Sequence, residues 1–245
     1  SGFIKVYQEG IIAQIPQSEQ SFVKVLTDPI QTTSYEADIS GRRLRWIDYM
    51  VPGILGLVLI WAGLNRASDT IASERTRGTF QRMVIAPVSP MTVLAGKLLS
   101  CLLIVYLSAV VMLASGVLLF QVSLYWNIPL IIALIFLGSP TAIGLGLIIS
   151  SLAKNAEAAN AITIVISVPL QFFIGAFFPL SIMPAPAQAF GEALPFTKFV
   201  EVMQGSMTKN LPISSLIPQI VYITASGIVL FAAGVITYWW SLKRL

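Results

Sequence analysis

The charged residues of this chain that could bind a partner are concentrated in one run, residues 73–82, with the sequence SERTRGTFQR. Its charged side chains are those of Glu74, Arg75, Arg77 and Arg82, whereas only 11% of all residues in the chain are charged. Because hydrophobic segments lie on both sides of this run, it must lie at a membrane surface and not in hydrocarbon. We interpret it as a surface that a partner outside the chain holds and moves.

The sequence lacks the residue patterns of most catalytic sites. It contains no histidine, which is the commonest metal ligand and a common catalytic base. The zinc-peptidase pattern HExxH and the hydrolase pattern GxSxG are absent, and the carboxylates are scattered. The nucleotide-binding pattern GxxxxGK[ST] is absent too, so the chain is not itself an ATPase. These features disfavour an enzyme.

The composition is that of a membrane protein. Of the 245 residues, 56% are hydrophobic and 11% are charged, whereas soluble domains contain roughly 25% charged residues. The net charge of +4 does not require nucleic acid as a partner, because membrane proteins gather basic residues on cytoplasmic loops. Cys101 is the single cysteine, so no disulfide can form within the chain.

Five segments are apolar and long enough to be membrane spans, each near the roughly 20 residues that a helix needs to cross a bilayer. The predicted spans are residues 49–64, 93–122, 128–152, 159–178 and 216–240. We therefore predict an all-α polytopic membrane protein with five transmembrane helices in this chain. The first helix is expected to continue beyond the membrane through Ser68 and Ile71 to Arg75.

The third predicted span is rich in small residues, which let another helix pack closely against it, and it contains a proline, which favours a kink. These residues are Gly138, Pro140, Gly144 and Gly146. We therefore expect this span to lie in close contact with a neighbouring helix.

Residues 1–46 are predicted to form a separate polar segment outside the cytoplasm, and residues 47–245 the membrane domain. We interpret the polar segment as a tether, with a remnant of a folded domain that handles substrate as the alternative. The chain begins at Ser1, with no methionine and no signal peptide. With residue 1 outside, we expect a preceding transmembrane helix that this sequence lacks, and six spans in the whole protein.

The loop charges predict how the chain crosses the membrane, because basic residues favour the cytoplasmic side. On one side basic residues outnumber acidic ones, and they are Arg66, Arg75, Arg77, Arg82, Lys97, Lys154, Lys243 and Arg244. On the other side Lys198 and Lys209 are balanced by two glutamates. The basic cluster at 42–45 departs from the rule, although nearby acidic residues offset it. We predict a plasma-membrane protein with its C-terminus in the cytoplasm and residue 1 outside.

Residues 71–86 are predicted to form an amphipathic helix that lies along the membrane surface. At 100° per residue, Arg75, Gly78 and Arg82 fall on one face and apolar residues fall opposite. Pro87 ends the helix before the next span. A glycine inside a helix costs about 1 kcal/mol relative to alanine, so Gly78 indicates close approach by another backbone, or a bend. A basic loop that only fixes the topology is the alternative.

Several short motifs follow one another along the chain. They are YMVPG at 49–53, ERTRGT at 74–79, PVS at 87–89, GK at 96–97, and GLG at 144–146 followed by Ser150, Ser151 and Asn155. A later stretch contains Gly175, Phe178, Pro179, Met183, Pro184, Leu194 and Pro195. In this order the motifs resemble those of the permeases of type-2 ABC exporters. The later stretch resembles that family's extracytoplasmic re-entrant hairpin, which precedes the last span.

The resemblance implies that residues 71–86 form a cytoplasmic coupling helix that docks on a separate ATP-binding subunit. The residues it assigns to this contact are Glu74, Arg75, Arg77, Gly78, Thr79, Arg82 and Pro87. ATP and magnesium would bind to that partner, with no cofactor in this chain, and a second permease copy would complete a homodimer or heterodimer. Two departures from the family's pattern bear on partner specificity: Gln204 stands where an arginine is expected, and Phe80-Gln81-Arg82 replaces a Leu or Glu pattern.

The fourth predicted span ends in an aromatic stretch that could contact substrate. The candidates for a substrate path or a dimer interface are Gln171, Phe172, Phe173, Phe177 and Phe178, with packing against lipid and neighbouring helices as the alternative. No ionisable residue lies in the middle of a predicted span, which disfavours transport driven by ions. We therefore expect export of a hydrophobic or amphipathic substrate: a drug, a lipid or a lipid-linked molecule. The alternatives are an ion-coupled transporter and a membrane scaffold that transports nothing.

Overall fold

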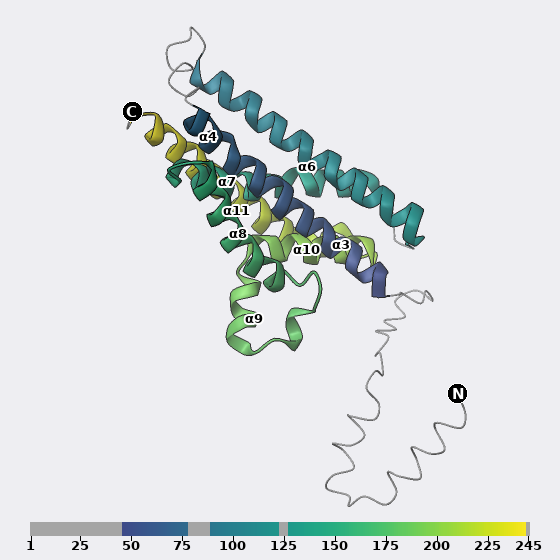
Figure 1. Ribbon diagram of the computed structural model, residues 1–245. Helices are drawn as coiled ribbons and strands as arrows, with labels where there is room; N and C mark the ends of the chain where they lie inside the picture. The colour runs from purple at the N-terminus through teal and green to yellow at the C-terminus, as the bar shows by residue number, and fades with distance from the viewer. Residues whose placement is uncertain (1–45, 78–88, 123–126, 244–245) are drawn as a thin grey trace, which may run out of the picture. The chain divides into compact units, whose positions relative to one another are not determined.

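The computed structural model describes residues 46–77, 89–122 and 127–243, and the elements within these residues are helices. They belong to the second of two units into which the chain divides, with the boundary after Arg45. The elements are α3 (Trp46–Val58), η1 (Leu59–Leu64), α4 (Asn65–Arg77), α6 (Pro90–Phe120), α7 (Ile128–Leu152), α8 (Ala156–Phe173), η2 (Leu180–Ile182), α9 (Ala185–Glu192), α10 (Pro195–Met207) and α11 (Ile213–Lys243) (Figure 1). The predicted polar segment 1–46 lies, apart from Trp46, outside the described residues, so the division into domains stays a prediction.

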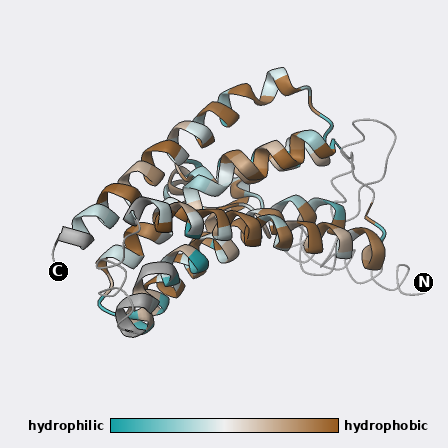
Figure 2. Ribbon diagram, turned by 90° about the horizontal axis from the view of Figure 1, so that it is seen from above, coloured by the Kyte–Doolittle hydropathy of each residue, from teal (hydrophilic) through white to brown (hydrophobic). Residues whose placement is uncertain are grey.

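Five stretches of helix are long and apolar enough to cross a membrane, which confirms the predicted five-span, all-α fold. They are Ile47–Asp69, Thr92–Phe120, Ile128–Leu152, Ala156–Phe173 and Ile213–Ser241. The first continues through α4 as far as Arg77, in agreement with the expected extension beyond the membrane. Hydrophobic residues are distributed along these helices (Figure 2).

The five spans differ in how deeply they are buried. In their most apolar windows, 56% of residues in the first span and 61% in the third are buried, against 17%, 22% and 17% in the second, fourth and fifth. The continuous helix α3–η1–α4 and helix α7 therefore form the centre of the bundle. Helices α6, α8 and α11 expose apolar side chains, such as Leu103 and Val165, and in a bilayer such faces meet lipid or other transmembrane helices.

Two asparagines cap the N-termini of α7 and α8. Asn127 precedes α7 and its Oδ1 accepts a hydrogen bond of 3.3 Å from the Leu130 amide, while Pro129 occupies the first turn. Asn155 precedes α8 and accepts a bond of 2.8 Å from the Ala158 amide. Both are N-caps, which satisfy amides that the first turn of a helix leaves without partners.

The first long helix is not α-helical throughout, a feature that its sequence does not indicate. Leu59–Leu64 form a π-helical turn between α3 and α4, a form with i→i+5 hydrogen bonds that occurs mostly as single turns inside α-helices. At the end of the turn, the Asn65 backbone N–H donates to the carbonyl oxygens of Trp61 and Ala62. Its side-chain Nδ2 also donates to the Trp61 oxygen, over 2.8 Å.

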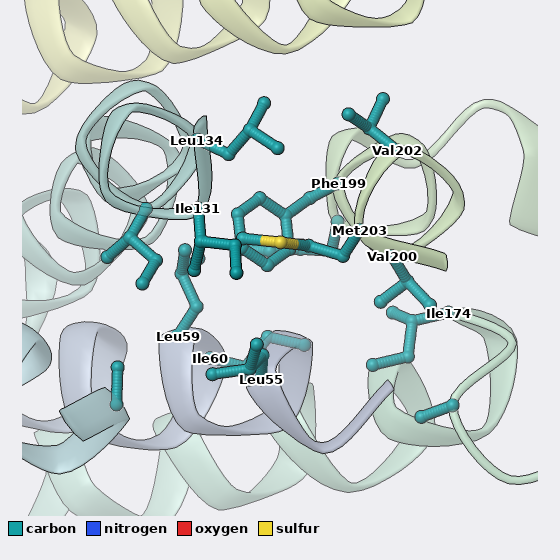
Figure 3. Packing of buried hydrophobic residues seen from close by; sticks show 14 of the residues in the cluster. Leu55, Leu59, Ile60, Ile131, Leu134, Ile174, Phe199, Val200, Val202 and Met203 are labelled. Carbon is teal, nitrogen blue, oxygen red and sulfur yellow. The ribbon is translucent and has the colours of Figure 1, made fainter. Parts of the chain in front are cut away.

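The largest hydrophobic cluster lies where α3, η1, α7 and α10 meet (Figure 3). Phe199 of α10 is 1% exposed, and its ring packs over Gly138 of α7. A Cβ added to Gly138 would lie 2.7 Å from the ring and 3.1 Å from Leu59 of η1. Glycine at this position therefore creates the space that the ring occupies between the two central helices.

The segment between the fourth and fifth spans, predicted to be a re-entrant hairpin, forms the short helices α9 and α10. Helix α10 is amphipathic: Phe196, Val200 and Met203 join the core, whereas Lys198 and Glu201 form an ion pair of 3.0 Å on its partly exposed side. It packs against α3, α7 and α11. The depth of this segment in a bilayer stays a prediction.

Candidate functional site

The candidate site for a partner is the end of α4, a helix that is mostly polar yet firmly packed. Ala67 and Ala72 are both 0% exposed and Ser68 is 2% exposed. One face of α4 packs on α7 and another on α8, so the described part of α4 behaves as an extension of the bundle. Its terminal residues follow directly in sequence from this buried part.

Small residues bring the first long helix and α7 into backbone contact. A Cβ added to Gly63 would lie 2.8 Å from the Ala142 Cβ, and one added to Gly146 would lie 2.6 Å from the Ala67 Cβ and 2.7 Å from the Leu64 carbonyl oxygen. Since each of these distances is shorter than real Cβ contacts, only glycine fits at positions 63 and 146. Close packing of this kind is what holds helices together in membranes.

A long-range hydrogen bond fixes α4 to the end of α7. The Ala72 amide donates to Ser150 Oγ over 3.1 Å, and both residues are buried. Ala159, at the start of α8, is 0% exposed and belongs to the same cluster as Ala72. A displacement of α4 must therefore displace the adjoining ends of α7 and α8 with it.

Helix α11 makes an equally close contact with the opposite side of α7. A Cβ added to Gly144 would lie 2.5 Å from the backbone of Leu230 and Phe231, and one added to Gly234 would lie 2.6 Å from the Gly144 carbonyl oxygen. The close approach expected for the third span is thus confirmed at Gly138, Gly144 and Gly146. The sequence interpretation missed the glycines that face α7 from the neighbouring helices: Gly63 meets Ala142, Gly227 meets Thr141 and Gly234 meets Gly144. The seven-residue spacing of Gly227 and Gly234 places this pair on one helix face.

The residues predicted to couple to a partner lie at the limit of the described structure. Glu74, Arg75 and Arg77 belong to the last turns of α4, where only the backbone is described. The other predicted coupling residues lie outside the described residues, and they are Gly78, Thr79, Arg82 and Pro87. The two-faced helix predicted for 71–86 is therefore helical as far as Arg77, and its role in coupling stays a prediction.

The five predicted substrate or dimer residues differ in exposure, and their role stays a prediction. Phe172 and Phe178 are 51% and 52% exposed, while Gln171, Phe173 and Phe177 are half-buried. Gln171, Phe172 and Phe173 belong to the end of α8, and Phe177 and Phe178 to the turn that follows. Separately from Phe172 and Phe178, the Phe173 ring packs edge-on against Phe190 of α9, with centroids 5.1 Å apart.

The turn after α8 is held between α3 and α10. Gly175 adopts a positive φ of 74°, and a Cβ added to Gly53 of α3 would lie 2.7 Å from the Ala176 backbone. The Thr197 hydroxyl donates to the Phe173 carbonyl oxygen over 3.2 Å. Gln204, which stands where the resembled family has arginine, donates a long hydrogen bond of 3.5 Å to the Gly175 carbonyl oxygen. The α10 side chains thus secure this turn.

Asp48 is the buried carboxylate at the start of the first span, 1% exposed in the first turn of α3. The positive end of the helix dipole favours a negative charge there. It lies at the end of the span and not in its middle.

These features define a polytopic helical membrane protein whose central helices are packed through small residues and whose first long helix projects to a polar end. The chain belongs to the ABC-2 family of transporter proteins, whose profile matches residues 3–236. This confirms the resemblance to type-2 ABC permeases.

Curated relatives agree with the family. The chain is 22% identical over 188 residues to the probable multidrug ABC transporter permease YbhR of Escherichia coli K12, covering 75% of this chain and 51% of that protein. It is 24% identical over 188 residues to the inner membrane transport permease YhhJ of Escherichia coli K12, covering 76% and 48%. A match to ABC transporter G family member 20 of Dictyostelium discoideum is 24% identical over 171 residues, covering 68% and 23%. The chain thus spans about half the length of the first two relatives. No solved structure matches the chain.

Proposed function

We propose that this chain is the permease part of an ATP-driven exporter, powered by a separate ATP-binding subunit that docks on residues 71–86. The observation that supports this most directly is the packing of α4. The predicted docking residues continue a helix whose buried face, at Ala67 and Ala72, is fixed to α7 and α8. A partner that moves the end of α4 would therefore move the membrane helices.

The proposed orientation places the end of α4 and the C-terminus in the cytoplasm. In Figure 1 the end of α4 and the end of α11, which precedes the C-terminus, lie at the same end of the bundle, and α9 lies toward the other. Lys154, in the turn between α7 and α8, is exposed, whereas Lys198 near α9 is paired with Glu201. Exposed basic charge at Lys154 agrees with the preference of basic residues for the cytoplasmic side.

The proposed substrate is hydrophobic or amphipathic: a drug, a lipid or a lipid-linked molecule. Relatives with the words multidrug ABC transporter permease in their names support this class. The exposed rings of Phe172 and Phe178 offer an apolar contact at the end of α8 away from α4. A second permease copy, identical or different, would complete the transporter, with ATP and magnesium held by the ATP-binding subunits.

The test is co-purification of the full-length protein from its native membrane, followed by ATPase and transport assays in proteoliposomes. We expect an ATP-binding subunit to co-purify, and the double variant Glu74→Ala/Gly78→Trp to abolish the dependence of ATPase activity on the permease. Glu192→Ala/Ser181→Trp makes the same two kinds of change at exposed positions of η2 and α9 and should preserve it. Full transport by the first double variant would show that the coupling assignment is wrong.

A further inference from the structure

Both central helices depart from regular α-helical hydrogen bonding. In the first, Leu59–Leu64 form the π-helical turn, with Leu59, Ile60, Gly63 and Leu64 buried. In the second, Pro140 lies inside α7 and has no N–H to donate to the Phe136 carbonyl. The Ser139 hydroxyl donates to that carbonyl oxygen instead, over 3.1 Å. Such side-chain bonds are how transmembrane helices tolerate proline.

The two irregular turns face each other. Gly63 of the π-helical turn meets Ala142, two residues after Pro140, and a Cβ added to Gly63 would lie 2.8 Å from the Ala142 Cβ. The adjacent Thr141 hydroxyl is buried and has no hydrogen-bond partner among the described residues. It faces Gly227 of α11, whose added Cβ would lie 3.1 Å from it. Small residues and incomplete hydrogen bonding therefore coincide at one level of the bundle.

The hydrophobic core is divided at the same level. One cluster, which we name the α10 block, lies on the side of this level where α10 packs, and it contains buried residues from all five spans and from α10. They are Leu55, Leu59, Ile60, Val105, Ala109, Ile131, Leu134, Ala142, Leu170 and Ile223, together with Phe199 and Met203 of α10. Two smaller clusters on the side of α4 are together named the α4 block. Their buried residues are Leu64, Ala67, Ala72, Leu94, Cys101, Ile143, Leu147, Ile149, Ala153, Ala159 and Tyr238. The first long helix passes between blocks within the π-helical turn, and α7 passes between Ala142 and Ile143.

We propose that the membrane domain contains a hinge at the π-helical turn and Ser139–Pro140, about which the α4 block and the α10 block move as two bodies. Within each block buried apolar side chains pack together, so the packing resists deformation. Between the blocks Gly63 contacts Ala142, and the partly buried Leu145 and Ile166 pack against both. Bending is expected at the π-helical turn and the proline, because these are the usual sites of helix kinks. The proposed function supplies only the force at α4; the hinge belongs to this chain alone.

The hinge would transmit a movement of α4 to the opposite end of the membrane domain. Movement of α4 carries the end of α7 with it through Gly146 and Ser150, and the start of α8 through the cluster that Ala72 shares with Ala159. The α10 block then changes its angle to the α4 block, and with it the turn at Gly175, which α10 holds through Thr197 and Gln204. A force on α4 at one membrane surface would thus tilt the α10 block at the other surface.

Distances between spin labels test the hinge in the full-length protein, in lipid nanodiscs and without any partner subunit. Native cysteines, including Cys101, are first replaced by alanine. Labels at Asp69→Cys and Lys209→Cys measure the distance between the two blocks, because Asp69 lies on α4 and Lys209 lies two residues after the end of α10. Labels at Asp69→Cys and Glu157→Cys measure a distance within the α4 block. Labels at Ile128→Cys and Lys209→Cys measure a distance within the α10 block. All four positions are exposed.

We expect a broader distance distribution across the blocks than within either block. Pro140→Ala restores an amide donor to the Phe136 carbonyl and should narrow the distribution across the blocks. Ser139→Ala removes the present donor and should broaden it. Pro129→Ala is the matched control, because the same substitution in the first turn of α7 adds no hydrogen bond inside the helix. Melting temperatures verify that each variant is folded.

Amide hydrogen exchange of the unsubstituted protein provides a second measurement that needs no variant. Residues 59–65 should exchange faster than the flanking buried turns of α3 and α4. Equal widths for all three label pairs, equal effects of Pro140→Ala and Pro129→Ala, or slow exchange across 59–65 would each overturn the hinge. Loss of the ATP-binding subunit in co-purification would overturn the proposed function instead, and these measurements would be unaffected.

Discussion

The Ala72 amide and the Ser150 hydroxyl oxygen are joined by a buried hydrogen bond of 3.1 Å, although the two residues are 78 positions apart in the chain. Ala72 lies in α4, five residues before the end of that helix at Arg77, and Ser150 lies near the end of α7. This bond, together with the contact of Gly146 with Ala67, anchors the segment proposed to receive force from the ATP-binding subunit.

Ser150→Ala should lower the free energy of unfolding by about 1 kcal/mol, the usual net contribution of one hydrogen bond. Ser151→Ala is the matched control, because the Ser151 hydroxyl only bonds back to the Leu147 carbonyl of its own helix, over 2.8 Å. Thermal unfolding in detergent measures both variants. Equal loss of stability in the two would show that the contact between helices contributes nothing of its own.

Gly63→Ala should destabilise the fold by about 1–3 kcal/mol, the usual cost of overpacking, because its new methyl group would meet the Ala142 Cβ at 2.8 Å. Adding Ala142→Gly removes the opposing methyl group and should recover much of this loss, a coupling expected of residues in contact. Gly96→Ala, where nothing lies within 4 Å of the added carbon, is the control and should be neutral or stabilising. Additive effects of the two substitutions would contradict the contact.

Phe199→Ala should destabilise the fold by about 3–5 kcal/mol, since it removes a buried ring and leaves a cavity between Gly138 and Leu59. Phe172→Ala is a matched control, because that ring is 51% exposed and should lose little packing within the chain. Unfolding by denaturant, compared between the two variants, decides whether α10 is a part of the core. Similar stabilities would argue that α10 is attached only loosely.

Gly175→Ala should lower stability by roughly 1–2 kcal/mol, the order of cost of a left-handed backbone for an ordinary residue. The φ of Gly175 is 74°. Gly175→Asn places a Cβ at the same position but tolerates that backbone better, so it should be the less damaging of the two. If both variants lose the same stability, contact of the Cβ with Leu180, 2.8 Å away, and not the backbone, decides the cost.

The positions of the spans could be predicted because each depends on length and apolar composition, which are local. The extension of the first helix was predicted as far as Arg75 and reaches Arg77. The close contacts at Gly138, Gly144 and Gly146 were predicted from the small residues themselves. The π-helical turn could not be predicted, because LIWAGL at 59–64 is an ordinary apolar sequence with no local signal for that form. The role predicted for the aromatic residues at 171–178 stays a prediction, and the left-handed turn at Gly175 that follows α8 was not predicted.

The membrane-spanning helices differ in length, and some do not match the thickness of the hydrocarbon core. Helices α6 and α11 have 31 residues each and, at 1.5 Å per residue, are about 46 Å long, whereas the hydrocarbon core is about 30 Å thick. Helix α8 has 18 residues and is about 27 Å long. The mismatch is accommodated by tilting of α6 and α11 or their extension into the headgroups, and beside α8 by thinning of the bilayer or by flanking residues that reach the interface. Lipid chain length should consequently alter the tilt of the outer helices, and with it the conformational balance of the protein.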